Sequence, residues 1–408
     1  MFPATVLVAI LTGFDVGVTI AASGLATLGF LLITGRRIPL YYGSSFSYIA
    51  AVSGVSAMVT AATGDKVAGI RAAQTGIVAS GLVSIAAGLL IKKGGPNLVK
   101  KILPPAVTGP VAIIIGLSLA SAAMGDASLN WAIAGATLIF TILFSVYLKG
   151  TLGQVSILFG VVAGYIVALL MGEVDMTPLL TAKLFSVPNF TLPSFDSWGL
   201  MAVGAITPVA IATIPESTAH LLQIDLYVNN LAKKLGRKKE YKIADLLGEN
   251  LIGDGIGDMI AGFIGGPAGT NYGENNSLMA ITRNFSVPVL MAASIIAIIM
   301  GFFGHIAGIV NTIPRAVIGG VSIYLFGVIG AQGVAIMLSE KVDLFSAKNL
   351  AIVATILIIG LGGAAMPNGM IEIGTLKLPA IATAAVFGIV LNLIFELFPA
   401  GDSEQQEE

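Results

Sequence analysis

Long apolar segments recur from one end of this chain to the other and constrain its fold more than any other feature. Most have about the 20 residues that an α-helix needs to cross the hydrocarbon of a membrane. Hydrophobic residues make up 56% of the 408 residues and charged residues only 11%, against roughly 25% charged in soluble proteins. No polar stretch is long enough to bury a core of its own. The sequence therefore predicts an all-α integral membrane protein.

We expect fourteen membrane spans in this chain. The first apolar run is shorter than the roughly 20 residues that a spanning helix requires, so we expect a truncated first span. The predicted spans are 1–14, 16–35, 43–60, 72–91, 103–122, 129–148, 152–172, 198–222, 246–264, 270–283, 286–305, 314–337, 349–366 and 377–398.

The positions of Lys and Arg test this number of spans, because cytoplasmic loops are rich in both residues. If the N-terminus lies inside, the inner loops hold 16 of the 21 Lys and Arg residues. The outer loops hold Lys66, Arg71, Lys183, Arg315 and Lys377. This asymmetry favours a multi-pass protein of the inner or plasma membrane with both termini in the cytoplasm.

Two pairs of similar segments lie seven predicted spans apart. Pro104–Ile113 and Pro314–Ile323 agree at six of ten positions. Gly43–Tyr48 and Gly269–Glu274 are both glycine-containing, polar interruptions of apolar runs. Because seven is odd, the two copies enter the membrane from opposite sides, as in the inverted repeats of secondary transporters. We therefore predict two inverted seven-helix repeats, with short strands in the broken third and tenth spans.

The tenth span contains a carboxylate, Glu274. Pro267 and two glycines, Gly269 and Gly273, interrupt the apolar pattern ahead of it. Backbone N–H groups are left without helical partners there, and a new helix begins near Glu274. An acidic residue at the centre of a membrane helix costs roughly 2.5–3.5 kcal/mol on insertion scales, so it persists where it faces a cavity or a partner. Glu274 is therefore a candidate ligand-binding residue.

The eighth span carries a second set of ionisable residues. Glu216 and His220 are four residues apart and therefore share one face of a helix. A purely structural pairing is the alternative, although ionisable residues inside membranes are functional by default. Together with Glu274 they predict a proton-coupled site, because imidazole gains and loses a proton near neutral pH.

Two further pairs allow alternative interpretations. Asp254 and Asp258 are also four residues apart, and we interpret them as residues at the start of a helix, packing the loop near the membrane interface. A place in an ion path is the alternative. Phe46 and Tyr272 lie in the two interrupted stretches, where they could enclose a planar ring, although simple packing is the commoner role of such aromatic residues.

Composition excludes several classes of function. The net charge of −1 argues against a nucleic-acid partner. The chain has no cysteine and only two histidines, His220 and His305, so a thiolate enzyme or a Cys-ligated metal centre is not expected. We therefore predict no metal, no cofactor and no enzymatic activity.

Residues 272–283 read Tyr-Gly-Glu-Asn-Asn-Ser-Leu-Met-Ala-Ile-Thr-Arg. This run resembles the signature of the nucleobase/ascorbate transporter family, and its first four residues are similar to the uracil permease branch. Glu216 and His220 match the family's eighth-helix motif, and Gly-Ser-Ser-Phe-Ser from residue 43 matches its third-helix segment. The resemblance extends over essentially the whole chain. Ser277 departs from it, since the family usually has Gly there, and this change would tighten the pocket slightly.

The resemblance implies a division into two domains and a set of site residues. The core domain would comprise 1–100 and 196–310, the gate domain 101–195 and 311–400, and 401–408 would form an acidic tail. The function implied is proton symport of uracil or a related pyrimidine nucleobase by alternating access. The substrate-binding residues implied are Glu216, Glu274, Phe46, Tyr272 and Gly273, and His220 and Glu216 would couple transport to protons.

Two other functions remain open at this stage. A carrier of xanthine or another purine belongs to the same family, and its members typically carry Gln where Glu274 stands. An anion transporter of the same fold would require a cationic or neutral site in place of two glutamates. The partners expected are a nucleobase, protons and membrane lipid, and a homodimer is compatible with the sequence.

Overall fold

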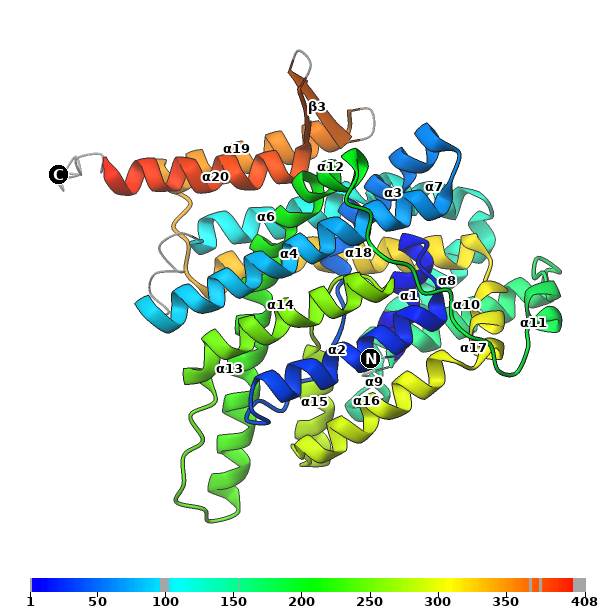
Figure 1. Ribbon diagram of the computed structural model, residues 1–408, viewed down its shortest axis with the longest axis horizontal. Coiled ribbons are helices and arrows are strands. Elements are labelled where there is room, and N and C mark those ends of the chain that lie inside the picture. Colours follow the sequence, from blue (N-terminus) through cyan, green and yellow to red (C-terminus); the bar gives the residue numbers. More distant parts are fainter. Residues whose placement is uncertain (1, 96–102, 154, 367–368, 374–375, 399–408) are drawn as a thin grey trace.

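The computed structural model describes residues 2–95, 103–153, 155–366, 369–373 and 376–398. Over these residues the chain is mostly helical, with two short two-stranded sheets (Figure 1). The helices are α1 (Phe2–Thr12), α2 (Val16–Ile33), α3 (Ile49–Thr63), α4 (Lys66–Gly94), α6 (Pro105–Ser118), α7 (Ala120–Ser128), α8 (Trp131–Tyr147), α9 (Gly150–Gly153), α10 (Ser156–Leu170), α11 (Thr177–Thr181), α12 (Ser197–Ile206), α13 (Ala210–Lys234), α14 (Leu247–Ile264), α15 (Gly273–Thr282), α16 (Val287–Gly301), α17 (Gly304–Asn311), α18 (Arg315–Ser339), α19 (Ala347–Ala364) and α20 (Ala380–Leu397). The 3₁₀ turns are η1 (Phe46–Tyr48), η2 (Thr207–Val209) and η3 (Ala244–Leu246), and the strands are β1 (Tyr42–Ser44), β2 (Gly269–Asn271), β3 (Met370–Ile373) and β4 (Leu376–Pro379).

Seven helical segments of the described chain are long and apolar enough to cross a membrane: α2, η1 with α3, α4, α6 with α7, α18, α19 and α20. An eighth results if Ser197–Val209 and Thr213–Lys234, which meet at 43°, form one span. Shorter apolar helices occupy three more of the predicted spans, at Trp131–Tyr147, Ser156–Leu170 and Val287–Gly301. These helices fit a multi-pass membrane protein, and the number of fourteen crossings stays a prediction.

Several helices begin where a polar side chain replaces the missing hydrogen-bond partners of the first turn. Asp15 accepts a hydrogen bond from the backbone N–H of Val18 at the start of α2. Asp65 and Asp196 act in the same way at the starts of α4 and α12. Such capping residues fix where a helix starts, and here they separate apolar runs that would otherwise merge.

Helix α14 packs very closely on α4 through glycines. A side-chain carbon on Gly81 would lie 2.5 Å from the carbonyl oxygen of Gly255, and one on Gly88 would lie 2.6 Å from that of Gly248. Small residues let the backbones of membrane helices approach in this way. The glycine-rich sequence of α14 therefore fixes this helix against α4, where it also contacts strand β2.

Strands β1 and β2 form an antiparallel pair inside the molecule, where the sequence predicts the broken third and tenth spans. Their register pairs Tyr42 with Asn271, Gly43 with Thr270 and Ser44 with Gly269. The extended stretch is shorter than predicted on the β1 side. It gives way to the 3₁₀ turn η1, where the Ser45 side chain accepts a hydrogen bond from the N–H of Ser47.

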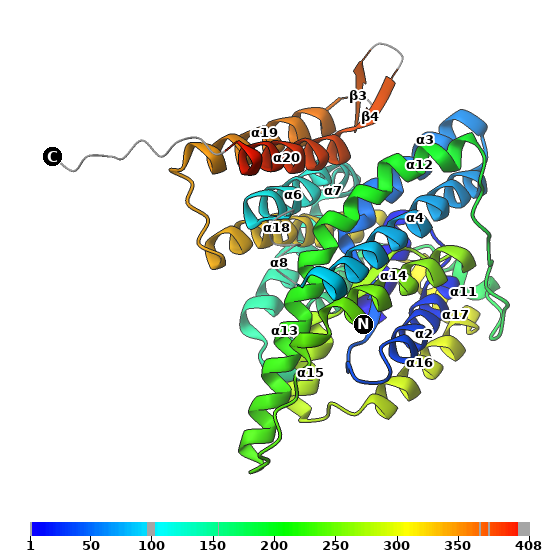
Figure 2. The same ribbon diagram turned by 60° about the vertical axis from the view of Figure 1, so that its left-hand side comes forward.

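A second strand pair was not predicted from the sequence. Strands β3 and β4 form a hairpin that projects from the body of the molecule in both views (Figures 1 and 2). The fourteenth predicted span starts at residue 377, whereas α20 begins at Ala380. Pro379 occupies the cap position of α20 and lacks the N–H that would continue a helix backwards.

The helices gather into two groups that lie on opposite sides of the molecule (Figure 2). In one group α14 packs against α2 and α4, and α16 packs against α2. In the other, α18 packs against α6, α7 and α8, and α19 packs against α20 and α6. This grouping resembles the expected core and gate domains, whose boundaries stay a prediction.

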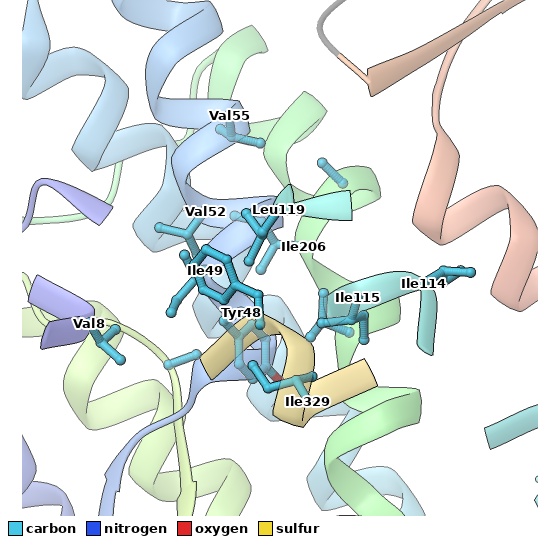
Figure 3. Packing of buried hydrophobic residues seen from close by; sticks show 14 of the residues in the cluster. Val8, Tyr48, Ile49, Val52, Val55, Ile114, Ile115, Leu119, Ile206 and Ile329 are labelled. Carbon is cyan, nitrogen blue, oxygen red and sulfur yellow. The ribbon is translucent and has the colours of Figure 1, made fainter. Parts of the chain in front are cut away.

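The two groups meet at a continuous apolar cluster to which the stretch after β1 contributes. Tyr48, Ile49 and Val52 belong to it, and Leu119, between α6 and α7, and Ile329 of α18 face them from the other group (Figure 3). All five side chains are buried. The stretch after β1 therefore supports the strand pair and also forms the contact between the helix groups.

Candidate functional site

The strand pair leads into two helix starts. Strand β1 continues through η1 into α3, and β2 is followed at once by α15, which begins at Gly273. The first N–H groups of a helix have no partner within the helix. A pair of broken spans in a membrane protein therefore offers backbone donors to a polar ligand.

Glu216 comes to this region from α13. Its side chain is half-buried, and its Oε2 accepts a hydrogen bond from the Ser47 hydroxyl at 3.4 Å. Ser47 belongs to η1, so this contact joins the eighth predicted span to the third. We did not single out Ser47 from the sequence, although its position beside Phe46 in a polar interruption was a usable signal.

His220 lies one turn further along α13 and contacts the start of α15. A side-chain carbon on Gly273 would lie 2.7 Å from Nε2 of His220, so the imidazole packs directly on the Gly273 backbone. The amide of Asn276 donates hydrogen bonds to the His220 carbonyl at 3.0 Å and to Gln223 Oε1 at 3.1 Å. These contacts hold α15 against α13. Glu274 is the second residue of α15, and its side chain lies outside the part of the chain that the structure describes.

The two candidate aromatic residues lie in different surroundings. Phe46 is half-buried at the start of η1 and packs against the apolar cluster. Tyr272 is buried, its ring lies against Gly43, and its hydroxyl donates a hydrogen bond to the Ser44 carbonyl at 2.9 Å. A second contact, of 3.2 Å, joins this hydroxyl to that of Thr5 in α1. Tyr272 therefore contacts β1 through its ring and its hydroxyl and stabilises the position of that strand.

The interpretation of Asp254 and Asp258 as residues at the start of a helix is wrong. Both lie in the interior of α14 and are buried, with 5% and 2% of their surface exposed. Asp258 accepts hydrogen bonds from the Tyr42 hydroxyl and from the N–H of Gly269, the latter at 2.8 Å. Asp254 accepts hydrogen bonds from the Ser217 hydroxyl and from the Asn271 amide. The close glycine packing of α14 brings these carboxylates to their donors, which offset the cost of burial.

A buried polar network surrounds Asp254 and reaches the residue next to Glu216. The Asn250 amide donates to the Ser217 hydroxyl at 2.6 Å, and the Asn271 amide donates to Asn250 Oδ1 at 3.1 Å. We missed this network from the sequence. A signal was present, because Asn250, Asp254 and Asp258 recur every four residues and so form a polar stripe along one face of α14.

A prominent cavity between the helix groups does not contain the candidate site. It has a volume of about 670 Å³ and is lined by residues of both helix groups, including Ile49, Ser53 and Phe326, together with an ion pair of 2.7 Å between Asp126 and Arg315. None of the candidate side chains that the structure describes lines it. Ile49, which lines it, lies three residues after Phe46 and also belongs to the apolar cluster.

A much smaller cavity lies behind the strand pair. Its volume is about 10 Å³, and it is lined by Asp254, Asp258 and Thr270, with Ser84 and Thr213. A polar space of roughly 10–15 Å³ holds one water molecule. Among the described residues no group of three or more His, Asp or Glu side chains is arranged to hold a metal ion.

Known proteins resemble this chain over nearly its whole length. A family model described as "Permease family" matches residues 1–369. The uracil permease of Bacillus caldolyticus is 39% identical, covering 100% of this chain and 92% of its own. The uracil permease of Escherichia coli strain K12 is 36% identical, covering 97% of this chain and 89% of its own. Among solved structures, the transmembrane domain of the cyanobacterial bicarbonate transporter BicA aligns with a TM-score of 0.55 at 16% identity, covering 96% of this chain and 93% of that one, which shows a shared fold.

Proposed function

This chain belongs to the permease family, and on that premise we propose that it is a proton-coupled symporter that imports uracil or a related pyrimidine nucleobase by alternating access. Uracil permeases that match over the full length of the chain support a nucleobase as the substrate. The chemistry of the site supports the same class of substrate.

The observation that carries this proposal is the convergence of Glu216, His220 and the start of α15 at the strand pair. Uracil presents lactam N–H donors beside carbonyl acceptors. A carboxylate only accepts hydrogen bonds, so Glu216 and Glu274 are suited to the N–H groups. The N–H groups at the start of α15 are suited to the carbonyl oxygens. Phe46 and Tyr272 would then lie close to the base, with Gly273 leaving room for it.

Proton coupling is proposed for His220 together with Glu216. The imidazole packs on Gly273 at the start of α15, and the carboxylate lies one helical turn away on the same face of α13. A proton bound at this site would therefore change the charge next to the substrate.

For the membrane topology we propose fourteen crossings in two inverted repeats, with both termini in the cytoplasm. The two helix groups would serve as core and gate domains, and the 670 Å³ cavity would be the vestibule on the outer side. The C-terminal end of α7 and the N-terminal end of α18 face the outer side in this topology. The ion pair of Asp126 and Arg315 would then lie at its mouth.

Uptake of radiolabelled bases by a host that lacks its own nucleobase transporters tests the proposal. We expect saturable uptake of uracil that excess unlabelled uracil abolishes and excess xanthine does not. Preferred uptake of xanthine would instead support a purine carrier of the same family. Uptake of bicarbonate without uptake of either base would overturn the proposed substrate class.

A further inference from the structure

We propose that Asp258 is a positioning residue that locks the strand pair to α14 and so holds the substrate-binding helix starts in place. This inference rests on the proposed function, because it names a further residue on which the same site depends. Asp258 acts through β1 and β2, with no part in contacting the base.

A single oxygen atom of Asp258 holds both strands. Oδ1 accepts a hydrogen bond from the Tyr42 hydroxyl of β1 and a second, of 2.8 Å, from the N–H of Gly269 in β2. Tyr42 and Gly269 lie at opposite ends of the paired register, since Tyr42 pairs with Asn271 and Ser44 with Gly269. The Tyr42 side chain therefore extends along the strand pair, and its hydroxyl and the Gly269 N–H donate to the same Asp258 oxygen.

The ring of Tyr42 fills the space between α14 and β2. A side-chain carbon on Gly257 of α14 would lie 2.8 Å from this ring, and one on Gly269 of β2 would lie 2.5 Å from it. Glycine at both positions is what admits the ring. Tyr42 is fully buried, so its hydroxyl requires the acceptor that Asp258 provides.

The strand pair needs such an anchor because it is very short. Each strand has three residues, and an isolated two-stranded pair has little stability of its own. On the far side, the Thr27 hydroxyl of α2 donates to the Tyr42 carbonyl at 2.8 Å and accepts from the Tyr42 N–H at 3.1 Å. Thr27 and Asp258 thus hold Tyr42 by hydrogen bonds from two helices. Loss of the hydrogen bonds to either residue would let η1 and α15 shift relative to Glu216.

The geometry indicates that the acceptor oxygen is what Asp258 supplies, and that its negative charge is dispensable. Both hydrogen bonds end on the same oxygen, and Asn keeps a carbonyl oxygen at that place. The Asn amide would point towards the small cavity, where hydroxyl groups of Ser84 and Thr270 can accept from it. Leu keeps the size and removes both bonds.

The test compares Asp258→Asn, Asp258→Leu and Tyr42→Phe in the full-length protein. Asp258→Leu loses two buried hydrogen bonds, so the apparent KM for uracil should rise about tenfold or more. Tyr42→Phe loses one, so the KM should rise about threefold. Asp258→Asn keeps both, so its KM should stay within about twofold of the wild-type value. The matched control is Asp225→Leu, which removes a carboxylate that also accepts backbone N–H bonds, from Ile243 and Ala244, away from the strand pair. It should leave the KM unchanged.

Amide hydrogen exchange in purified protein separates this inference from the proposed function. Residues 42–44 and 269–271 should lose protection in Asp258→Leu and keep it in Asp258→Asn, whatever the substrate proves to be. An Asp258→Leu protein with an unchanged KM and unchanged protection would overturn the inference. So would an Asp258→Asn protein as impaired as Asp258→Leu, because the charge would then be required. If Asp258→Leu does not fold, Tyr42→Phe decides by the same two measurements.

Discussion

The carboxylate of Glu216 accepts hydrogen bonds from two donors in the proposed mechanism. One of its oxygens accepts a hydrogen bond from Ser47, and in the proposed mechanism the group also accepts a hydrogen bond from a lactam N–H of the base. Its neighbour Ser217 is held by the buried network of α14. The rotation of α13 is therefore fixed at the residue next to the proposed ligand, and small changes at Glu216 should act on binding more than on folding.

Glu216→Gln tests this role. Gln keeps the size of the side chain and an oxygen for Ser47, but its amide N–H₂ would face another donor. We expect uracil uptake to fall by about tenfold to a hundredfold, the range for a buried donor left unpaired, with unchanged amounts of protein in the membrane. Wild-type uptake kinetics in this variant would remove Glu216 from the site.

Glu274→Gln tests the second proposed carboxylate. An amide presents a donor on one side and an acceptor on the other, so the variant should lose uracil uptake or accept a purine. Competition of labelled uracil by unlabelled bases measures both outcomes. If the variant takes up uracil with wild-type kinetics, the assignment of Glu274 as a ligand fails.

Residues that act through local spacing could be predicted from the sequence, and those that act across the fold could not. The four-residue spacing puts Glu216 and His220 on one face of any helix. Tyr42 and Asp258, in contrast, are 216 residues apart and meet because glycines let α14 approach the strand pair. A carboxylate after a basic loop is compatible with a surface position, and that ambiguity led to the wrong interpretation of Asp254 and Asp258.

At the scale of elements, the strand pair and the half-helix α15 are the parts that the sequence indicated most clearly, because Pro267, Gly269 and Gly273 interrupt a regular helix there. The hairpin of β3 and β4 was missed. Strand β4 reads Leu-Lys-Leu-Pro and runs directly into the apolar helix α20, so hydropathy alone does not mark where the strand ends and the helix begins.

A valine at the start of α15 should disturb the site through the contact of Gly273 with His220. The added carbon would lie 2.7 Å from Nε2 of His220, which is too close without a shift of the imidazole. The control is Gly204→Val on α12, where nothing lies within 4 Å of the added carbon. We expect Gly273→Val to lose most uracil uptake and Gly204→Val to keep it, with both proteins present in similar amounts. Equal uptake in both variants would contradict the proposed place of α15 in the site.

On the scale of the whole molecule, Ile49 and Leu119 belong both to the lining of the 670 Å³ cavity and to the apolar cluster between the helix groups. In the alternating-access mechanism that we propose, the two helix groups would move apart at this cluster to connect the cavity with Glu216.

Coupling to protons predicts how transport responds to ion gradients. Uracil uptake should collapse when an uncoupler removes the proton gradient and should be indifferent to replacement of sodium by potassium. His220→Gln should keep equilibrium exchange of uracil and lose uphill accumulation, because Gln cannot carry the proton. Uptake that requires sodium would contradict proton coupling and direct attention to the buried carboxylates of α14.

The pairing of β1 with β2 also has a consequence for how the protein is made. Residues 42–44 are synthesised and inserted more than two hundred residues before their partners at 269–271. Until then Thr27 of α2 can hold the backbone of Tyr42, but Gly43 lacks its partner Thr270, and a membrane supplies no water to replace it. The early helices are therefore inserted long before the site is complete, because more than half of the chain is synthesised in between. A nascent chain that ends before residue 269 should hold its first helices in the membrane with the segment around Tyr42 still open to proteases.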